Sequence, residues 1–84
     1  MDVDLKQLKV AMLCWPTRTG QAVLNQAFSM VEAKAVPTSE GVWQVDETTW
    51  RKAMNLCARV PYGGRWVWQA RRNLWWAIDR ATEV

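Results

Sequence analysis

Seven tryptophans in a chain of 84 residues limit what this sequence can fold into. A chain of this length supports one domain, which buries about 60–65% of the surface that the unfolded chain exposes. Each Trp side chain carries roughly 150–250 Å² of surface. Three or four short helices cannot hide all seven, so we expect at least two Trp side chains to be exposed. Large exposed aromatic patches usually mark an interface.

The remaining composition is that of a folded protein without a membrane partner. Half of the residues are hydrophobic and 23% are charged, which separates the chain from disordered proteins. No stretch approaches the ~18 apolar residues that predict a membrane span. The sequence begins Met1-Asp2-Val3-Asp4, which is acidic where a signal peptide is basic. We therefore expect a cytoplasmic protein.

Apolar residues recur at helical spacing in the first part of the chain. Residues 3–15 form one such segment, with Asp2 as the expected cap and the following proline as its end. A second helix begins after Thr17 or Thr19 and ends at the next proline. Residues 1–36 are thus predicted to form a helical hairpin. The expected core stripe of its second helix consists of Leu24, Ala27, Phe28, Val31 and Ala35.

The second part of the chain, residues 42–83, is predicted to mix short strands with helices. After a turn-rich break at 37–41, residues 42–45 form a short strand, and Asp46 caps a third helix that runs to about Ala58. Another turn follows at 61–64. Residues 65–69 are either a second strand paired with 42–45 or the first turn of a last helix ending near residue 82, and we favour the strand.

These elements predict one compact domain, residues 1–84, in the order α-α-β-α-(β)-α. Its class is mainly α with a minor β element, and a two-stranded hairpin packed on a helical bundle is one form of it. The pattern V-W-Q-x5-W occurs twice, starting at Val42 and at Val67. It indicates either a duplicated strand–helix unit or a coincidence.

Residue types suited to catalysis are scarce. The chain has no His, so it lacks the commonest general base and the commonest metal ligand. Cys14 and Cys57 have no zinc or redox spacing, and buried reduced thiols are favoured over a disulfide. The pair Asp46 and Glu47 fits a helix N-terminus better than a catalytic pair. We therefore expect no enzymatic activity, no catalytic residues, no metal and no cofactor.

The net charge of +3 comes entirely from the second half of the chain. At about 100° per residue, the third helix places Trp50, Ala53, Met54 and Cys57 on one side. A basic stripe occupies the other side and is either a solvated surface or a nucleic-acid contact, since Arg and Asn suit guanine and adenine edges. The stripe consists of Thr48, Arg51, Lys52, Asn55 and Arg59.

The last helix combines Trp and Arg outside its apolar stripe. Trp68 and Trp75 fall on one flank, and the helical period puts Trp76 among polar residues. An exposed Trp beside Arg is typical of protein interfaces or of a surface that stacks on single-stranded bases, unless the ring lies over neighbouring methylenes. We favour a protein interface. Its predicted contacts are Arg51, Arg59, Arg65, Trp68, Arg71, Arg72, Trp75 and Trp76.

Residues 41–54, Gly-Val-Trp-Gln-Val-Asp-Glu-Thr-Thr-Trp-Arg-Lys-Ala-Met, resemble the wing strand and following helix of small winged-helix, excisionase-type DNA-binding proteins. The resemblance covers 14 of the 84 residues. Upstream, the second helix is poor in the basic and polar residues of a recognition helix. The resemblance implies DNA binding through the third helix.

Two functional hypotheses therefore stand side by side. The first is a non-enzymatic protein that docks on another protein and masks, inhibits or bridges it. The second is a DNA- or RNA-binding module that uses the basic stripe of the third helix. Excess apolar surface on a small protein is also consistent with a homodimer. The size and composition are similar to those of accessory proteins of phages and mobile elements.

Overall fold

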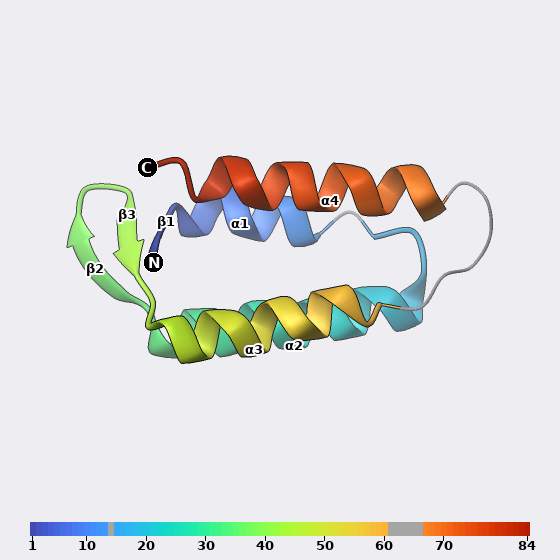
Figure 1. Ribbon diagram of the computed structural model, residues 1–84, viewed down its shortest axis with the longest axis horizontal. Coiled ribbons are helices and arrows are strands. Elements are labelled where there is room, and N and C mark those ends of the chain that lie inside the picture. The colour runs from blue at the N-terminus through green and yellow to red at the C-terminus, as the bar shows by residue number, and fades with distance from the viewer. Residues whose placement is uncertain (14, 61–66) are drawn as a thin grey trace.

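The computed structural model describes residues 1–13, 15–60 and 67–84, the last range without the side chain of Val67. Within these described residues, four helices and three short strands follow one another (Figure 1). This confirms the prediction of a mainly α protein with a minor β element. The elements are β1 Asp2–Val3, α1 Leu5–Met12, α2 Arg18–Lys34, β2 Val36–Ser39, β3 Val42–Gln44, α3 Glu47–Ala58 and α4 Val67–Ala81.

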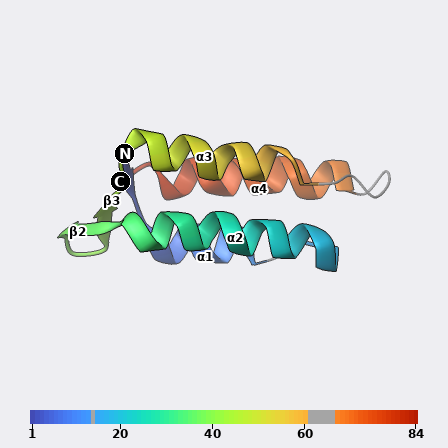
Figure 2. The ribbon, with the colours of Figure 1, turned by 90° about the horizontal axis from the view of Figure 1, so that it is seen from below.

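The helices run up and down along one axis and form two layers (Figures 1 and 2). α2 packs against α3 in one layer, and α1 packs against α4 in the other. The outcome is an elongated bundle of 40 × 19 × 17 Å with the sheet at one end. α1 is much shorter than α4, so it covers only part of that helix.

Polar side chains fix where the first three helices begin. Asp4, and not the expected Asp2, caps α1, because its Oδ1 accepts hydrogen bonds from the backbone N–H groups of residues 6 and 7. Asp2 lies in β1 instead. Thr17 caps α2 by accepting from the N–H of Gly20 at 3.1 Å. Asp46 caps α3 through the N–H of Thr49, as predicted.

The sheet differs from the predicted hairpin. β3 pairs with β1 and β2, and not with the strand predicted at 65–69. The strand order is β1-β3-β2, with both pairs antiparallel. The break predicted at 37–41 contains most of the edge strand β2, where Pro37 is tolerated. Gly41, at φ 76°, lies in the turn to β3. The strand predicted at 65–69 is wrong for residues 67–69, which begin α4, while 65 and 66 lie outside the described residues.

The chain termini meet beside the sheet (Figure 1). Met1 exchanges two hydrogen bonds with the backbone of Val45, and the N–H of Asp4 donates to the carbonyl of Ala81 at 2.8 Å. The first pair joins the N-terminus to the residue that follows β3, and the last hydrogen bond joins the start of α1 to the end of α4. Apolar side chains from all four helices, with Val3 and Val45 from the sheet end, fill the core between the layers.

Candidate docking groove

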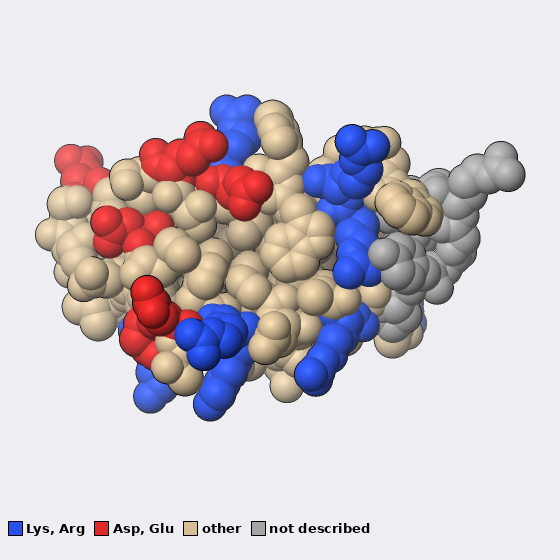
Figure 3. Space-filling view, in the orientation of Figure 1, with Lys and Arg blue, Asp and Glu red and all other residues tan. Residues whose placement is uncertain are grey.

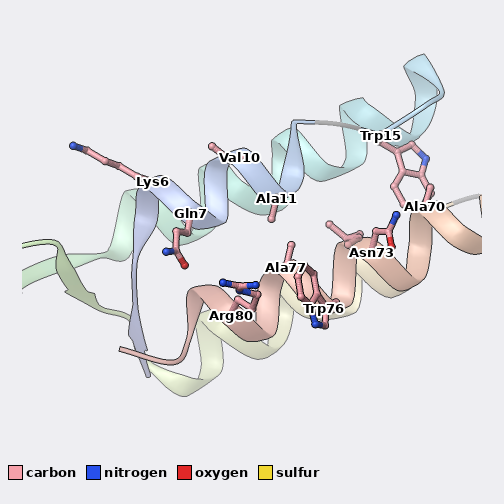
Figure 4. Close-up of a pocket in the computed structure, with 11 residues that line it drawn as sticks. Lys6, Gln7, Val10, Ala11, Trp15, Ala70, Asn73, Trp76, Ala77 and Arg80 are labelled. Atoms are coloured by element: carbon pink, nitrogen blue, oxygen red, sulfur yellow. The ribbon is translucent and has the colours of Figure 1, made fainter.

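A groove of about 820 Å³ runs along the boundary between α1 and α4, and we call it the α1–α4 groove (Figure 4). It lies where small residues of the two helices come together, while Leu8 and Met12 of α1 and Ile78 of α4 are buried in the core. The lining residues are Lys6, Gln7, Val10, Ala11, Trp15, Ala70, Asn73, Leu74, Trp76, Ala77 and Arg80.

Small residues make the bottom of the groove apolar. Ala11 on α1 lies opposite Ala77 on α4, Ala70 lies farther along α4 beside Trp15, and all three are half-buried (Figure 4). Leu74 lies below them in the core. Val10 adds an aliphatic side chain that is 65% exposed. A side chain entering the groove would therefore exchange water for methyl and methylene groups, which is favourable by about 25 cal/mol per Å² of apolar surface buried.

Trp76 stands at the rim of the groove with 62% of its surface exposed. The guanidinium carbon of Arg80, one helical turn later, lies 4.8 Å from the centre of its ring (Figure 4). This is the geometry of a cation–π contact. The contact restricts the orientation of the exposed indole ring.

Hydrogen-bond donors dominate the polar rim. Lys6 and Arg80 are cationic, and both lie toward the sheet end of the groove (Figure 4). The amide oxygen of Asn73 accepts from Gln69 at 3.0 Å, so its two N–H bonds are directed elsewhere. No Asp or Glu is found among the lining residues that the structure describes. The rim is suited to an acceptor-rich, negatively charged ligand.

Trp15 closes the far end of the groove, just beyond α1 (Figure 4). It belongs to the core, with 8% of its surface exposed, although the predicted helix was to include it. Gln21 of α2 holds this turn by accepting from the N–H of Trp15 at 3.0 Å and donating to the carbonyl of Met12. The Nε1 atom of Trp15 is buried and has no acceptor among the described residues.

The other predicted residues of α4 that the structure describes do not line the groove. Trp68 is 63% exposed, whereas Trp75 is half-buried and packs against the core. Arg71 donates to the carbonyl of Ala58 at 3.0 Å and so joins α4 to the C-terminus of α3. Arg72 is exposed on α4 and does not line the groove. Arg65 lies outside the described residues.

The predicted basic stripe of α3 is exposed along its whole length, and we call it the basic α3 face. All five of its members are exposed or nearly so, while Ala53 and Cys57 on the opposite side are buried. It belongs to the other layer of the bundle from the α1–α4 groove. The five residues are Thr48, Arg51, Lys52, Asn55 and Arg59.

The arrangement of α2 and α3 differs from that in helix-turn-helix proteins. There, two consecutive helices cross at about 90–120° and are joined by a tight turn. Here α2 and α3 lie side by side and antiparallel, and the strands β2 and β3 separate them in the chain (Figures 1 and 2). The similarity of residues 41–54 to a wing and helix therefore does not extend to the arrangement of the helices.

Charge is unevenly distributed over the surface. In the face drawn in Figure 3, acidic side chains gather toward the end that carries the sheet and both termini. Lys and Arg side chains lie along the lower edge at the same end, at the top, and nearer the middle of this face. This face therefore carries charges of both signs toward the sheet end and mostly positive charge nearer the middle.

The α1 side of the groove was missed by sequence reasoning. Its residues Lys6, Gln7, Val10 and Ala11 are absent from the predicted contacts. The one available signal was Val10, an aliphatic residue opposite the buried positions Leu8 and Met12. Which surface it faces depends on the pairing of α1 with α4, and these helices come from opposite ends of the chain.

The chain matches no protein-family model, and neither curated proteins nor solved structures show a significant similarity to it. Within the described residues, no helix has both the length and the apolar character needed to cross a bilayer. The same part of the chain contains no group of three or more His, Cys, Asp or Glu side chains placed to hold a metal ion.

Proposed function

We propose that this protein is a non-enzymatic binding protein that docks on another protein through the α1–α4 groove. The observation that carries the proposal is Trp76, which is 62% exposed, oriented by Arg80, and set beside an apolar bottom. Trp and Arg are the residues most enriched among those that dominate binding energy at protein interfaces. Docking of this kind acts by masking, inhibiting or bridging the target.

A preorganised anchor favours a protein partner. Binding costs free energy for every flexible side chain that becomes ordered, and the contact with Arg80 lowers this cost for Trp76. The hydrogen-bond donors on the rim would orient the partner around an apolar centre. An apolar centre with a polar rim is the usual arrangement in protein interfaces. We place the protein in the cytoplasm, where the buried Cys57 thiol would stay reduced.

Affinity capture with two Trp variants tests the proposal. The tagged protein, Trp76→Ala and Trp68→Ala are incubated with an extract of the source cells, with and without nuclease, and captured proteins are identified by mass spectrometry. Trp68 is the matched control, because it is 63% exposed on the same helix but lies outside the groove. Trp76→Ala should weaken capture by roughly 30-fold or more, and Trp68→Ala should not.

Nucleic-acid binding is the second candidate, and the exposure of the basic α3 face favours it. Affinity for DNA or RNA would fall steeply with salt, in proportion to the phosphates neutralised. It would also be lost in an Arg51→Glu/Arg59→Glu variant. Binding that is nuclease-sensitive and lost in this double variant, but unchanged by Trp76→Ala, would overturn the docking proposal.

A further inference from the structure

We infer that the α1–α4 groove receives an amphipathic helix whose acidic residues lie beside Lys6 and Arg80. This inference rests on the proposed docking function and adds the chemistry of the partner. It follows from the length of the groove, the small side chains along its bottom, and the placement of the charges around it.

The dimensions of the groove fit a helix of about three turns. Its lining on α4 runs from Ala70 to Arg80, which at 1.5 Å per residue corresponds to about 15 Å. Both walls are helices that run antiparallel (Figures 1 and 4). Because Ala11 and Ala77 are small, a third helix can approach closely. Its ridge of side chains would then pack between α1 and α4. Apolar residues of that helix would contact Val10 and Trp76.

The charges around the groove select the partner and its direction. Both lining cations, Lys6 and Arg80, lie at the sheet end, and the described lining contains no Asp or Glu. Carboxylates of a bound helix would pair with these cations at that end. The C-terminal end of a helix also carries partial negative charge, so an acidic C-terminal turn suits this position best.

A second copy of this chain is a poor occupant of the same groove. A two-fold contact places the same patch of each copy face to face. In either direction of such a contact, the described lining of one copy offers no carboxylate to Lys6 and Arg80 of the other. Homodimer formation through another surface remains a separate prediction, which the oligomeric state in light scattering tests.

Two synthetic peptides test the inference. Both have about 14 residues, or four helical turns, and the same Leu and Ala stripe at positions i, i+3, i+4 and i+7. One carries Glu on both sides of the stripe in its last turn, and the other carries Lys there. Binding is followed by NMR chemical shifts of the ¹⁵N-labelled full chain and by fluorescence anisotropy of the labelled peptide.

The acidic peptide should shift the indole N–H signal of Trp76 and the amide signals of Val10 and Ala77. It should bind about tenfold more tightly than the Lys peptide, given the modest strength of exposed ion pairs. A spin label on its acidic end should broaden the signal of Gln7 more than that of Asn73. Trp76→Ala should abolish binding of the acidic peptide.

Charge reversal separates recognition from folding. In Lys6→Glu/Arg80→Glu the preference should invert, so that the Lys peptide binds more tightly. The matched control is Lys9→Glu/Arg72→Glu, which makes the same change of charge at exposed positions of the same two helices outside the groove. This control should still prefer the acidic peptide, and both variants should give dispersed amide spectra.

Several results would overturn the inference. Equal affinity for the two peptides, or no shift at the groove with either, would reject the acidic helix as occupant. If capture of proteins from extract still depended on Trp76, the docking function would stand and only the acidic helix would be rejected. Concentration-dependent shifts of the same signals in the protein alone would assign the groove to a second copy. Shifts caused by a single-stranded oligonucleotide in place of the peptides would assign it to nucleic acid.

Discussion

The buried indole of Trp15 lies directly against Gly20 in the first turn of α2. A Cβ atom built on Gly20 would collide with Nε1 and Cδ1 of the Trp15 ring. Thr17, which caps the same turn, is also within contact distance of that position. The turn between α1 and α2, and with it the far end of the α1–α4 groove, therefore depends on a missing side chain.

Gly20→Ala should destabilise the protein despite the better helix propensity of Ala. The gain from propensity is about 1 kcal/mol, whereas overpacking against a buried ring costs about 1–3 kcal/mol. Urea unfolding measures the difference. Gln26→Ala, an exposed position of the same helix, is the control and should be close to neutral. A more stable Gly20→Ala protein would show that Trp15 is not held in this position.

Gln21 should contribute more to stability than an ordinary surface glutamine. Its side chain binds the backbone on both sides of the turn, through the N–H of Trp15 and the carbonyl of Met12. Replacing it with Ala removes both hydrogen bonds and should lower the free energy of unfolding by about 2 kcal/mol. Asn25→Ala, which removes only the contact between the two side chains, should cost less.

Hydrogen exchange gives an independent check on Gln21. The amide of Trp15 should exchange slowly in the wild-type protein and in Asn25→Ala. It should exchange quickly in Gln21→Ala, because its acceptor is gone. Equal protection of this amide in all three proteins would contradict the role of Gln21.

The helices could be predicted because their signals are local. The cap at Asp46 and the helical spacing of the apolar residues predict the bounds of α3 almost to the residue. The strands β1 and β2 carry no such signal. β1 has two residues and exists only because it pairs with residues 43 and 44, which lie far along the chain. Pairing between such distant segments depends on the tertiary fold, so a local sequence pattern does not predict it.

The repeated tripeptide Val-Trp-Gln shows how context decides between strand and helix. Residues 42–44 form β3, where Gly41 provides the turn and two neighbouring strands provide partners. Residues 67–69 begin α4 instead. Val and Trp favour strands, but the apolar stripe that follows residue 69 has a helical period and packs on the core. The prediction of a strand at 65–69 relied on the local preference of these residues, whereas the 15 residues of Val67–Ala81 form one helix.

The candidate site was predicted in part. The helical period placed Trp76 and Arg80 on the polar side of α4, and the structure finds both exposed. The period could not show that α1 packs beside them, since helix pairing depends on the whole fold. For the same reason, the contact between Arg71 and the end of α3 had no signal in the sequence.

Cys57 should resist alkylation while the protein is folded. Its side chain is buried, and burial raises the pKa of the thiol to about 11, so almost no reactive thiolate exists near pH 8. In a Cys14→Ser background, iodoacetamide should label Cys57 slowly in buffer and rapidly in urea. Fast labelling of the folded protein would contradict the burial of Cys57.

The same shift predicts how Cys57 affects stability at high pH. Because the pKa is raised by folding, the protonated thiol contributes to the free energy of unfolding. This contribution is complete below the ordinary thiol pKa of 9.0 and is lost as the pH rises toward 11. Between these pH values the thiol ionises in the unfolded chain and stays protonated in the folded one, so ionisation lowers the free energy of the unfolded state alone. Cys57→Ala should therefore lose less stability over this interval than the protein that retains the thiol.

Asp46 should make α3 sensitive to acid. Hydrogen bonds from the side chain and backbone N–H of Thr49 hold the pKa of its carboxyl below the usual value. The stabilisation is therefore present above the pKa of the unfolded chain, about 3.9, and is lost as the pH falls through the lowered value. Asp46→Asn keeps an acceptor for the cap but does not titrate. Thermal unfolding at pH 7 and pH 3 should show a smaller acid-induced decrease in Tm for this variant than for the wild-type protein.

The contact between Trp76 and Arg80 should govern the mobility of the anchor. Removing the cation in Arg80→Ala releases the ring, and ¹⁵N relaxation of the Trp76 indole should then report a lower order parameter. Affinity for a groove ligand should fall about two- to fivefold, the range of an exposed cation–π contact. Arg80→Lys retains a cation and should lie between the two. Arg72→Ala, one turn before Trp76, is the control, and an equal loss of order in that variant would show that helix fraying, and not Arg80, sets the motion of the ring.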